Sequence, residues 1–64
     1  MAMQKPRVGG RAKATVPGEK IEYGTIIEVS PSGRRYQVEW DQPDECGQTI
    51  SMHELSPASY VRPV

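Results

Sequence analysis

The chain has 64 residues, a formal net charge of zero at pH 7, one cysteine and one histidine. This length provides one small domain, and the cysteine and histidine counts exclude an internal disulfide and a four-ligand structural zinc site, so we expect no metal and no cofactor. No apolar run approaches the ~18 residues that cross a bilayer, and the first residues lack the apolar stretch of a signal peptide, so we expect a cytoplasmic protein that does not bind membranes.

Proline and glycine interrupt residues 1–9, which show no apolar periodicity. We therefore predict a flexible N-terminal arm over residues 1–9 and a single folded domain over residues 10–64. A first strand is predicted over residues 11–16, where charged or polar side chains alternate with small apolar ones. The alternation places three side chains inward: Ala12, Ala14 and Val16.

The clearest structural signal is a pair of β-rich runs around the turn at residues 30–33. Pro31 presets the backbone angle of the second turn position, and Gly33 tolerates the left-handed conformation that closes such a loop. The pattern predicts a hairpin whose strands cover residues 23–30 and 34–41.

The two strands of this hairpin differ in how clearly they alternate. In the first, we expect Ile27 and Val29 to point inward and Ile26 to lie on the opposite side. The second alternates strictly and places three large side chains on one face: Tyr36, Val38 and Trp40.

The remainder of the chain predicts a loop, two strands and one helical turn. After the loop at residues 42–47, a strand is expected over residues 48–52, with Ile50 and Met52 inward. A single helical turn is predicted over residues 53–57. A closing strand over residues 58–62 suits a sheet edge, because the prolines that bracket it cannot donate ladder hydrogen bonds.

This order resembles the SH3-like barrels, a superfold that includes the KOW, Tudor and Agenet modules, and it resembles short uncharacterised bacterial SH3-like proteins. The residues that carry the resemblance are Gly10-Arg11, Gly24-Thr25-Ile26-Ile27, Tyr36-Gln37-Val38-Glu39-Trp40-Asp41 and His53-Glu54-Leu55. The fold class predicted is all-β, a five-stranded SH3-like barrel with one short helical turn before the last strand. This superfold hosts many unrelated functions.

The aromatic residues suggest one kind of site. Resemblance to Tudor modules implies an aromatic cage that holds a methylated Lys or Arg by cation–π attraction. Tyr36 and Trp40 share a face with Val38, which favours the core over a cage. Tyr23, at a loop–strand junction, is expected to be exposed.

The charged residues suggest a second kind of site. Arg34 and Arg35 at the hairpin tip, extended by Arg11 and Lys13, form a patch that can contact phosphates, as the resemblance to KOW modules also implies. Alternatively, the hairpin arginines pair with nearby acids: Glu28, Glu39 or Asp41. Acids crowd the next loop at Asp44 and Glu45.

Enzymatic signatures are weak. His53 and Glu54 are adjacent and therefore point in different directions, and the acidic neighbours of Cys46 disfavour a reactive thiolate. The segment Gly47-Gln48-Thr49-Ile50 and a later Leu55 resemble type II dihydrofolate reductases, which are SH3-like tetramers. Their pore is lined by Val-Gln-Ile-Tyr, and this chain has Gln48-Thr49-Ile50-Ser51 without the tyrosine. Such an enzyme is a remote alternative.

These observations favour a non-catalytic small binding or adaptor module that recognises a protein partner through its loops at residues 17–22, 30–35 and 42–47. The alternative is a KOW/Tudor-like module that binds DNA or RNA through the basic arm and the hairpin tip. A domain this small also gains from self-association, so a homo-oligomer stays open. The binding residues predicted are Arg11, Lys13, Tyr23, Arg34, Arg35, Asp44 and Glu45.

Overall fold

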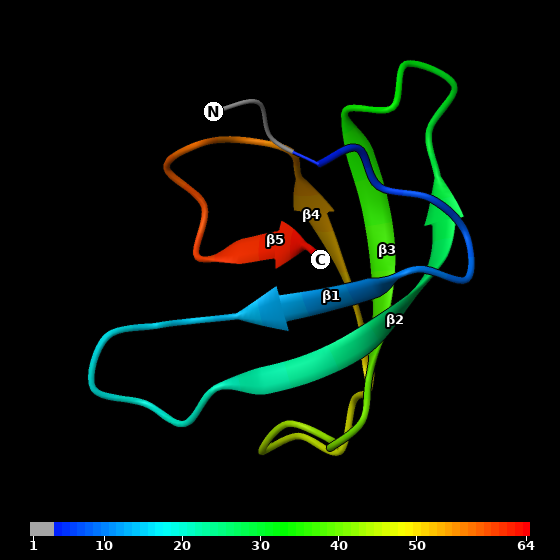
Figure 1. Cartoon of the computed structure of the whole chain (residues 1–64). Helices are drawn as coiled ribbons and strands as arrows, with labels where there is room; N and C mark the ends of the chain where they lie inside the picture. The colour runs from blue at the N-terminus through cyan, green and yellow to red at the C-terminus, as the bar shows by residue number, and fades with distance from the viewer. Residues whose placement is uncertain (1–3) are drawn as a thin grey trace.

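In a computed structural model that describes residues 4–64, the chain forms one curled antiparallel sheet (Figure 1). Its strands are β1 (Arg11–Ala14), β2 (Glu22–Val29), β3 (Arg35–Trp40), β4 (Ile50–Glu54) and β5 (Val61–Pro63). The spatial order is β4-β3-β2-β1-β5, so the sheet is a half-barrel with β4 and β5 at its edges. The all-β class with five strands, and the edge position of the last strand, are confirmed.

The short helical turn expected over residues 53–57 is not confirmed. His53 and Glu54 continue β4, because the ladder with β3 extends to the pair Arg35 and Glu54. Residues 4–64 contain no helix, and so none that has the length and apolar character to cross a membrane.

The sheet curls because β2 bends between its two neighbours. In Figure 1 the first half of β2 runs beside β1, and its second half turns upward beside β3. Gly24 lies buried where β2 meets β3. A Cβ atom at this position would lie 2.5 Å from Cγ1 of Val38 and 2.7 Å from the carbonyl oxygen of Glu39. The two backbones therefore approach more closely than any residue with a side chain allows.

A β-bulge at Ile27 changes the alternation of β2. Ile26 pairs with Val38 and Glu28 with Gln37, so one extra residue lies between the two pairs. The expectation for these isoleucines was wrong: Ile26 is buried at 1% exposure, whereas Ile27 is 38% exposed. A bulge shifts the side-chain alternation by one residue, and nothing in a local apolar run indicates where it occurs.

The inward face of β4 was also predicted wrongly. Ile50 is 47% exposed and Met52 is 60% exposed. The register places Ser51 opposite Val38 and His53 opposite Tyr36. Residues directly opposite one another share a face of the sheet, so the polar residues of β4 lie on the core side.

The core lies inside the curl and follows the alternation of β1 and β3. The buried residues include Ala12, Ala14, Tyr36 and Val38, as predicted. Partly buried side chains that pack against this core are Val29, Trp40, Leu55 and Val61. The hydroxyl of Tyr36 donates a hydrogen bond to the carbonyl oxygen of Val61 at 3.3 Å. This bond joins β3 to β5, which are not neighbours in the sheet, and burial raises the pKa of the Tyr36 hydroxyl.

Part of the predicted arm lies against the sheet. The backbone N–H of Gly9 donates to the carbonyl oxygen of Ile26 at 2.8 Å, and the N–H of Ile26 donates to Gly10 at 2.8 Å. Pro6 is buried. Residues 1–3 of the predicted arm lie outside the described residues, and the boundary between residues 9 and 10 stays a prediction.

Replacing Gly24 by alanine is expected to destabilise the fold by about 1–3 kcal/mol, because the added methyl group overlaps Val38 and the β3 backbone. Denaturant unfolding measures this change. In the double variant with Val38→Ala, the nearest clashing atom is absent. We therefore expect a loss smaller than the sum of the two single losses by at least about 0.5 kcal/mol. Strict additivity would show that Gly24 and Val38 do not contact one another as described.

Candidate functional site

The structure distributes the predicted binding residues over three places. Arg11, Lys13 and Tyr23 lie on the β1–β2 ladder. The other positions are the hairpin tip, with Arg34 and Arg35, and the β3–β4 loop, with Asp44 and Glu45. Tyr23 lies seven residues along β2 from the hairpin turn at Ser30, which corresponds to about 23 Å of strand. The basic residues of β1 and those of the hairpin tip therefore do not form one compact patch.

Arg11 forms an ion pair with the acid that directly follows β3. Its Nη2 lies 2.6 Å from Oδ2 of Asp41 and its Nη1 lies 3.2 Å from Oδ1, a two-pronged contact. Nη1 also donates to the Thr25 hydroxyl at 2.8 Å. The hydrogen bond from Arg11 holds the pKa of the Asp41 carboxyl below its ordinary value. The sequence suggested Asp41 as a partner of the hairpin arginines, but Arg11–Asp41 is the one ion pair found within residues 4–64.

Lys13, Tyr23, Tyr60 and Arg62 form a set that we call the basic–aromatic face. Lys13 Nζ lies 6.0 Å from the centre of the Tyr23 ring, and Arg62 of β5 pairs with Lys13 in the ladder. Tyr23 is 45% exposed, as expected, and Tyr60 is 55% exposed. Two aromatic rings and two cations are thus available on β2, β1, β5 and the residue that precedes β5.

At the hairpin tip, two serines hold the turn and the arginines extend from it. The hydroxyl of Ser30 accepts the N–H of Arg35 at 3.1 Å, and Ser32 accepts the N–H of Arg34 at 3.3 Å. Gly33 has a φ of +75°, the left-handed conformation predicted for the turn. Both arginines are exposed, and Arg35 lies across the ladder from Glu54.

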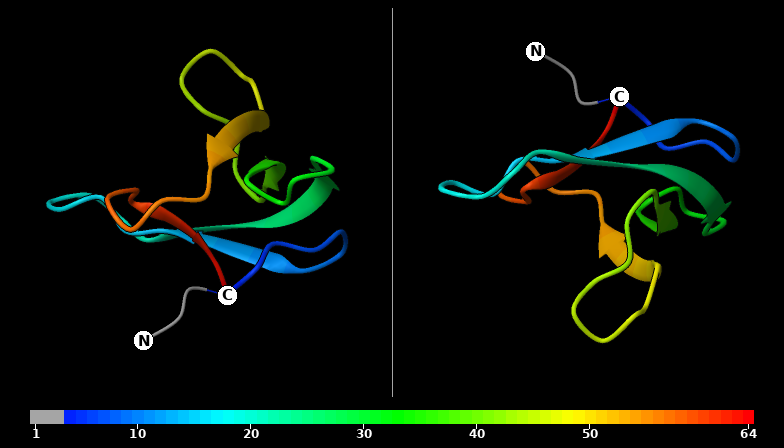
Figure 2. Two further views of the ribbon diagram at one scale, coloured as in Figure 1. Left: turned by 90° about the horizontal axis from the view of Figure 1, so that it is seen from above. Right: turned by 90° about the horizontal axis from the view of Figure 1, so that it is seen from below.

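The β3–β4 loop extends away from the sheet (Figure 2) and is organised by Asp44. Oδ1 of Asp44 accepts the backbone N–H groups of Cys46 at 2.9 Å and Gln48 at 2.8 Å. The N–H of Asp44 donates to the carbonyl oxygen of Gln48 at 2.8 Å. These bonds fix the orientation of the Asp44 carboxylate, whereas Glu45 and the Cys46 thiol are exposed.

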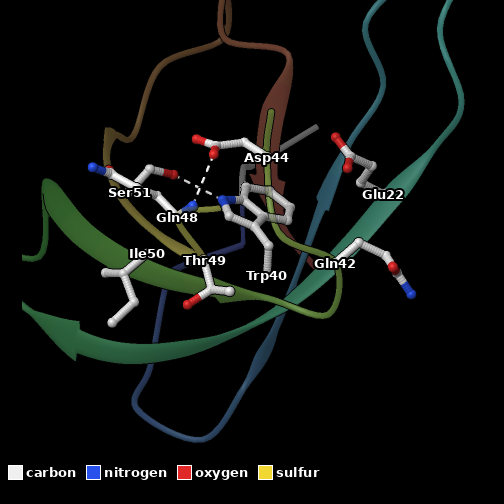
Figure 3. A pocket seen from close by; sticks show the side chains of 8 residues that line it. All are labelled: Glu22, Trp40, Gln42, Asp44, Gln48, Thr49, Ile50 and Ser51. Carbon is white, nitrogen blue, oxygen red and sulfur yellow. Dashed lines mark hydrogen bonds between the residues drawn. The ribbon is translucent and has the colours of Figure 1, made fainter. Parts of the chain in front are cut away.

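Beside this loop lies a shallow pocket of about 150 Å³, which we call the Trp40 pocket. It is lined by Glu22, Trp40, Gln42, Asp44, Gln48, Thr49, Ile50 and Ser51. Figure 3 shows the indole ring at the centre of these side chains, with the Asp44 carboxylate to its upper left and the Glu22 carboxylate to its upper right. The lining includes two acids and no base, so the pocket is electrostatically suited to a cation.

A chain of hydrogen bonds fixes the Trp40 ring. The indole N–H donates to the hydroxyl of Ser51 at 2.7 Å, and this hydroxyl lies 2.6 Å from Nε2 of His53. The hydroxyl has one proton and two acceptor lone pairs, so it can bond to Trp40 and His53 together, and the tautomer of His53 sets the direction of the second bond. The His53 ring also packs edge-on against Trp40, with ring centres 5.7 Å apart, and burial lowers the pKa of His53.

Sequence reasoning missed Ser51 as a partner of Trp40, and it placed His53 in a helical turn. The signal that could have found them is the strict alternation Ser51, His53 opposite Tyr36, Val38, because a strand paired with β3 brings one of its two faces into the core. Within residues 4–64, no three potential metal ligands cluster.

Comparison with known protein families, curated proteins and solved structures found no match to this chain. The half-barrel and its strand order are compatible with an SH3-like barrel. Membership of a particular SH3-like family therefore stays an expectation from the sequence.

The buried contact of His53 predicts how stability depends on pH. Because folding lowers the His53 pKa from its ordinary 6.5, the unfolded chain binds the proton more readily than the folded one. The free energy of unfolding should therefore be fully retained above pH 6.5 and should fall as the pH drops below that value. The Asp41 carboxyl acts separately, because its lowered pKa affects stability only near and below its ordinary 3.8.

Urea unfolding between about pH 7.5 and about pH 5 measures this effect. In His53→Gln, the side-chain amide can still form a hydrogen bond with the Ser51 hydroxyl but does not titrate. This variant should lose most of the slope in that range, whatever its overall stability. An unchanged slope would assign the dependence to other groups.

Proposed function

We propose that this chain is a non-catalytic SH3-like binding module that recognises a protein segment by a lysine or arginine inserted into the Trp40 pocket. The observation that supports this function is the position of Glu22 and Asp44 beside the Trp40 ring, in a pocket without a basic residue. A cation in this position can contact the π face of an indole and two carboxylates together. Each contribution is modest at an exposed site, about 0.5–1 kcal/mol for the ring and more for charge-assisted hydrogen bonds.

The size of the pocket supports a side chain rather than a metabolite. A volume of about 150 Å³ is below the roughly 300–1,000 Å³ typical of small-molecule sites. An ammonium or guanidinium group at the end of a flexible stem fits this space, and the rest of the partner segment then lies along the β3–β4 loop. This proposal retains the protein partner, and it retains Asp44 among the binding residues predicted from the sequence.

The groups that line the pocket favour an unmodified basic side chain. Tudor-type cages use several aromatic rings for methylated cations, which offer few N–H donors. Here one ring is accompanied by carboxylates, which accept hydrogen bonds. Asp44 is held by the N–H groups of Cys46 and Gln48, so little entropy is lost when a partner binds it.

Selection from a random peptide library, followed by titration of the selected peptides, tests this function. Trp40 is the sole tryptophan, so its fluorescence reports directly on occupancy of the pocket. The selected peptides should share a Lys or Arg, and replacing that residue by Gln should weaken binding about tenfold or more. Peptides without any basic preference, or binding that leaves the Trp40 emission unchanged, would contradict the proposal.

Matched variants of the protein separate the pocket from general charge effects. Asp44→Asn keeps the oxygen that accepts the loop N–H groups but removes the charge. Glu22→Gln removes the charge of the second acid at nearly constant size. Each should weaken binding about tenfold. Glu19→Gln makes an identical charge change in the β1–β2 loop, outside the pocket, and should leave the affinity unchanged.

A second candidate function, binding of single-stranded DNA or RNA, is favoured by the basic–aromatic face. Exposed aromatic rings stack on bases, and neighbouring cations contact the phosphates. Tyr23 of β2, Lys13 of β1 and Arg62 of β5 lie side by side. Arg11 contributes less than expected, because Asp41 already neutralises it.

Fluorescence anisotropy with labelled single strands tests this candidate. Binding should weaken as salt increases, with a slope of log K against log salt of about −1 to −2, given two cations on this face. Tyr23→Ala and Lys13→Ala should each weaken it severalfold. The double variant Arg34→Ala, Arg35→Ala is the control: a larger loss there would move the site to the hairpin tip.

A further inference from the structure

We propose that β4 is a self-pairing edge: two copies of this chain associate by antiparallel pairing of their β4 strands, with Met52 on the two-fold axis. This proposal does not depend on the Trp40 pocket or on any ligand. It rests on the hydrogen-bonding groups, the side chains and the register of β4.

One side of β4 has backbone groups without a strand partner. The carbonyl oxygen of Thr49 accepts a hydrogen bond from Trp40 at 2.6 Å, and the N–H of Leu55 donates to Arg34 at 2.7 Å. In an antiparallel ladder, alternate residues direct their N–H and C=O groups to the same side. Ile50, Met52 and Glu54 therefore direct theirs away from β3, and within residues 4–64 no strand pairs with that side.

The two edges of the sheet differ in how they are protected against pairing. β5 contains Pro63, which lacks an N–H, and the cationic Arg62. β4 has no proline, lysine or arginine, and its outward side chains at positions 50 and 52 are apolar, with Glu54 at one end. Proline, exposed charge and short length are common means by which edges avoid association. β5 combines all three within three residues, whereas β4 has an outward charge at one end alone.

The register favours a second copy over an unrelated strand. With Met52 opposite Met52 of the second copy, Ile50 lies opposite Glu54 and Ser51 opposite His53. All three outward-directed residues then pair, which gives about six backbone hydrogen bonds. The two Glu54 carboxylates lie at opposite ends of the paired strands, so like charges do not meet. The apolar Met52 side chains, 60% exposed in the single chain, cover each other.

Moving the register by two residues loses these advantages. Ile50 would then lie opposite Met52, and Glu54 would face Gln48. The backbone groups of Gln48 are already bound to Asp44. Pairing centred on Met52 therefore satisfies more backbone groups than this shifted register.

The surface area buried between the two β4 strands determines how stable the dimer is expected to be. Pairing of two strands that are five residues long buries well under the ~800 Å² per partner of standard stable interfaces. We therefore expect a reversible dimer with a dissociation constant of about 10–500 μM rather than an obligate one.

Sedimentation of the full chain from about 10 μM to about 1 mM tests the assembly. The mass should rise from 7.1 kDa toward twice that value and no further. Amide exchange followed by NMR over the same concentration range tests whether the two copies pair through β4. The amides of Ile50, Met52 and Glu54 should become slower with concentration, whereas those of Ser51 and His53, which face β3, should change little. A monomer at about 1 mM, or a dimer in which the first three amides stay fast, overturns the proposal.

A charged substitution at the axis provides the variant test. Met52→Lys places two ammonium groups beside each other in the dimer, and the exposed position tolerates the change in the single chain. It should weaken association at least tenfold. Ile21→Lys, at another exposed position that is 53% exposed and outside β4, is the matched control and should not. Equal effects of the two variants would overturn pairing through β4.

Discussion

The close approach of β2 to β3 at Gly24 is the constraint on which the curl of this sheet depends. Val38 Cγ1 and the Glu39 carbonyl oxygen occupy the space that a side chain would need at position 24. This contact lets β2 bend between β1 and β3, and the bulge at Ile27 follows shortly after it. The bend brings β5 near enough for Tyr36 to donate to the Val61 carbonyl. A side-chain hydrogen bond thus links β3 to β5 across the inside of the curl, whereas a closed barrel would need a ladder between the edge strands β4 and β5.

The polar inner face of β4 has consequences on both sides of the sheet. On the core side, Ser51, which is itself hydrogen-bonded to His53, accepts the indole N–H of Trp40, a donor that would otherwise be costly to bury. Trp40 can therefore pack partly on the core and still line a pocket. On the outer side, the same alternation exposes Ile50 and Met52. The fixed indole and the apolar edge thus have one cause, the register of β4 against β3.

The sequence predicts those parts of the fold that local patterns control. Strict alternation in β3 placed Tyr36 and Val38 in the core, and small residues identified the inner face of β1. The isoleucines of β2 were misplaced because a bulge depends on the neighbouring strand. β4 was misplaced because Ile50 and Met52 look like core residues until the pairing with β3 is known. The candidate site shows the same difference. The exposure of Tyr23 follows from its local sequence and could be predicted. The Arg11–Asp41 pair joins residues that are 30 positions apart, so local sequence does not indicate it.

The Trp40 pocket and the β4 edge share residues, and this overlap would couple the two proposed binding events. Ile50 and Ser51 line the pocket and also belong to the strand proposed to pair. An edge strand held on one side alone fluctuates more than one held on both sides, so pairing would order one wall of the pocket before a ligand arrives. Linkage requires the effect to be reciprocal: a ligand that orders this wall favours the dimer by the same factor. If both proposals hold, a basic peptide shifts the monomer–dimer equilibrium. Peptide binding that leaves this equilibrium unchanged would mean that the two sites act independently despite their common wall.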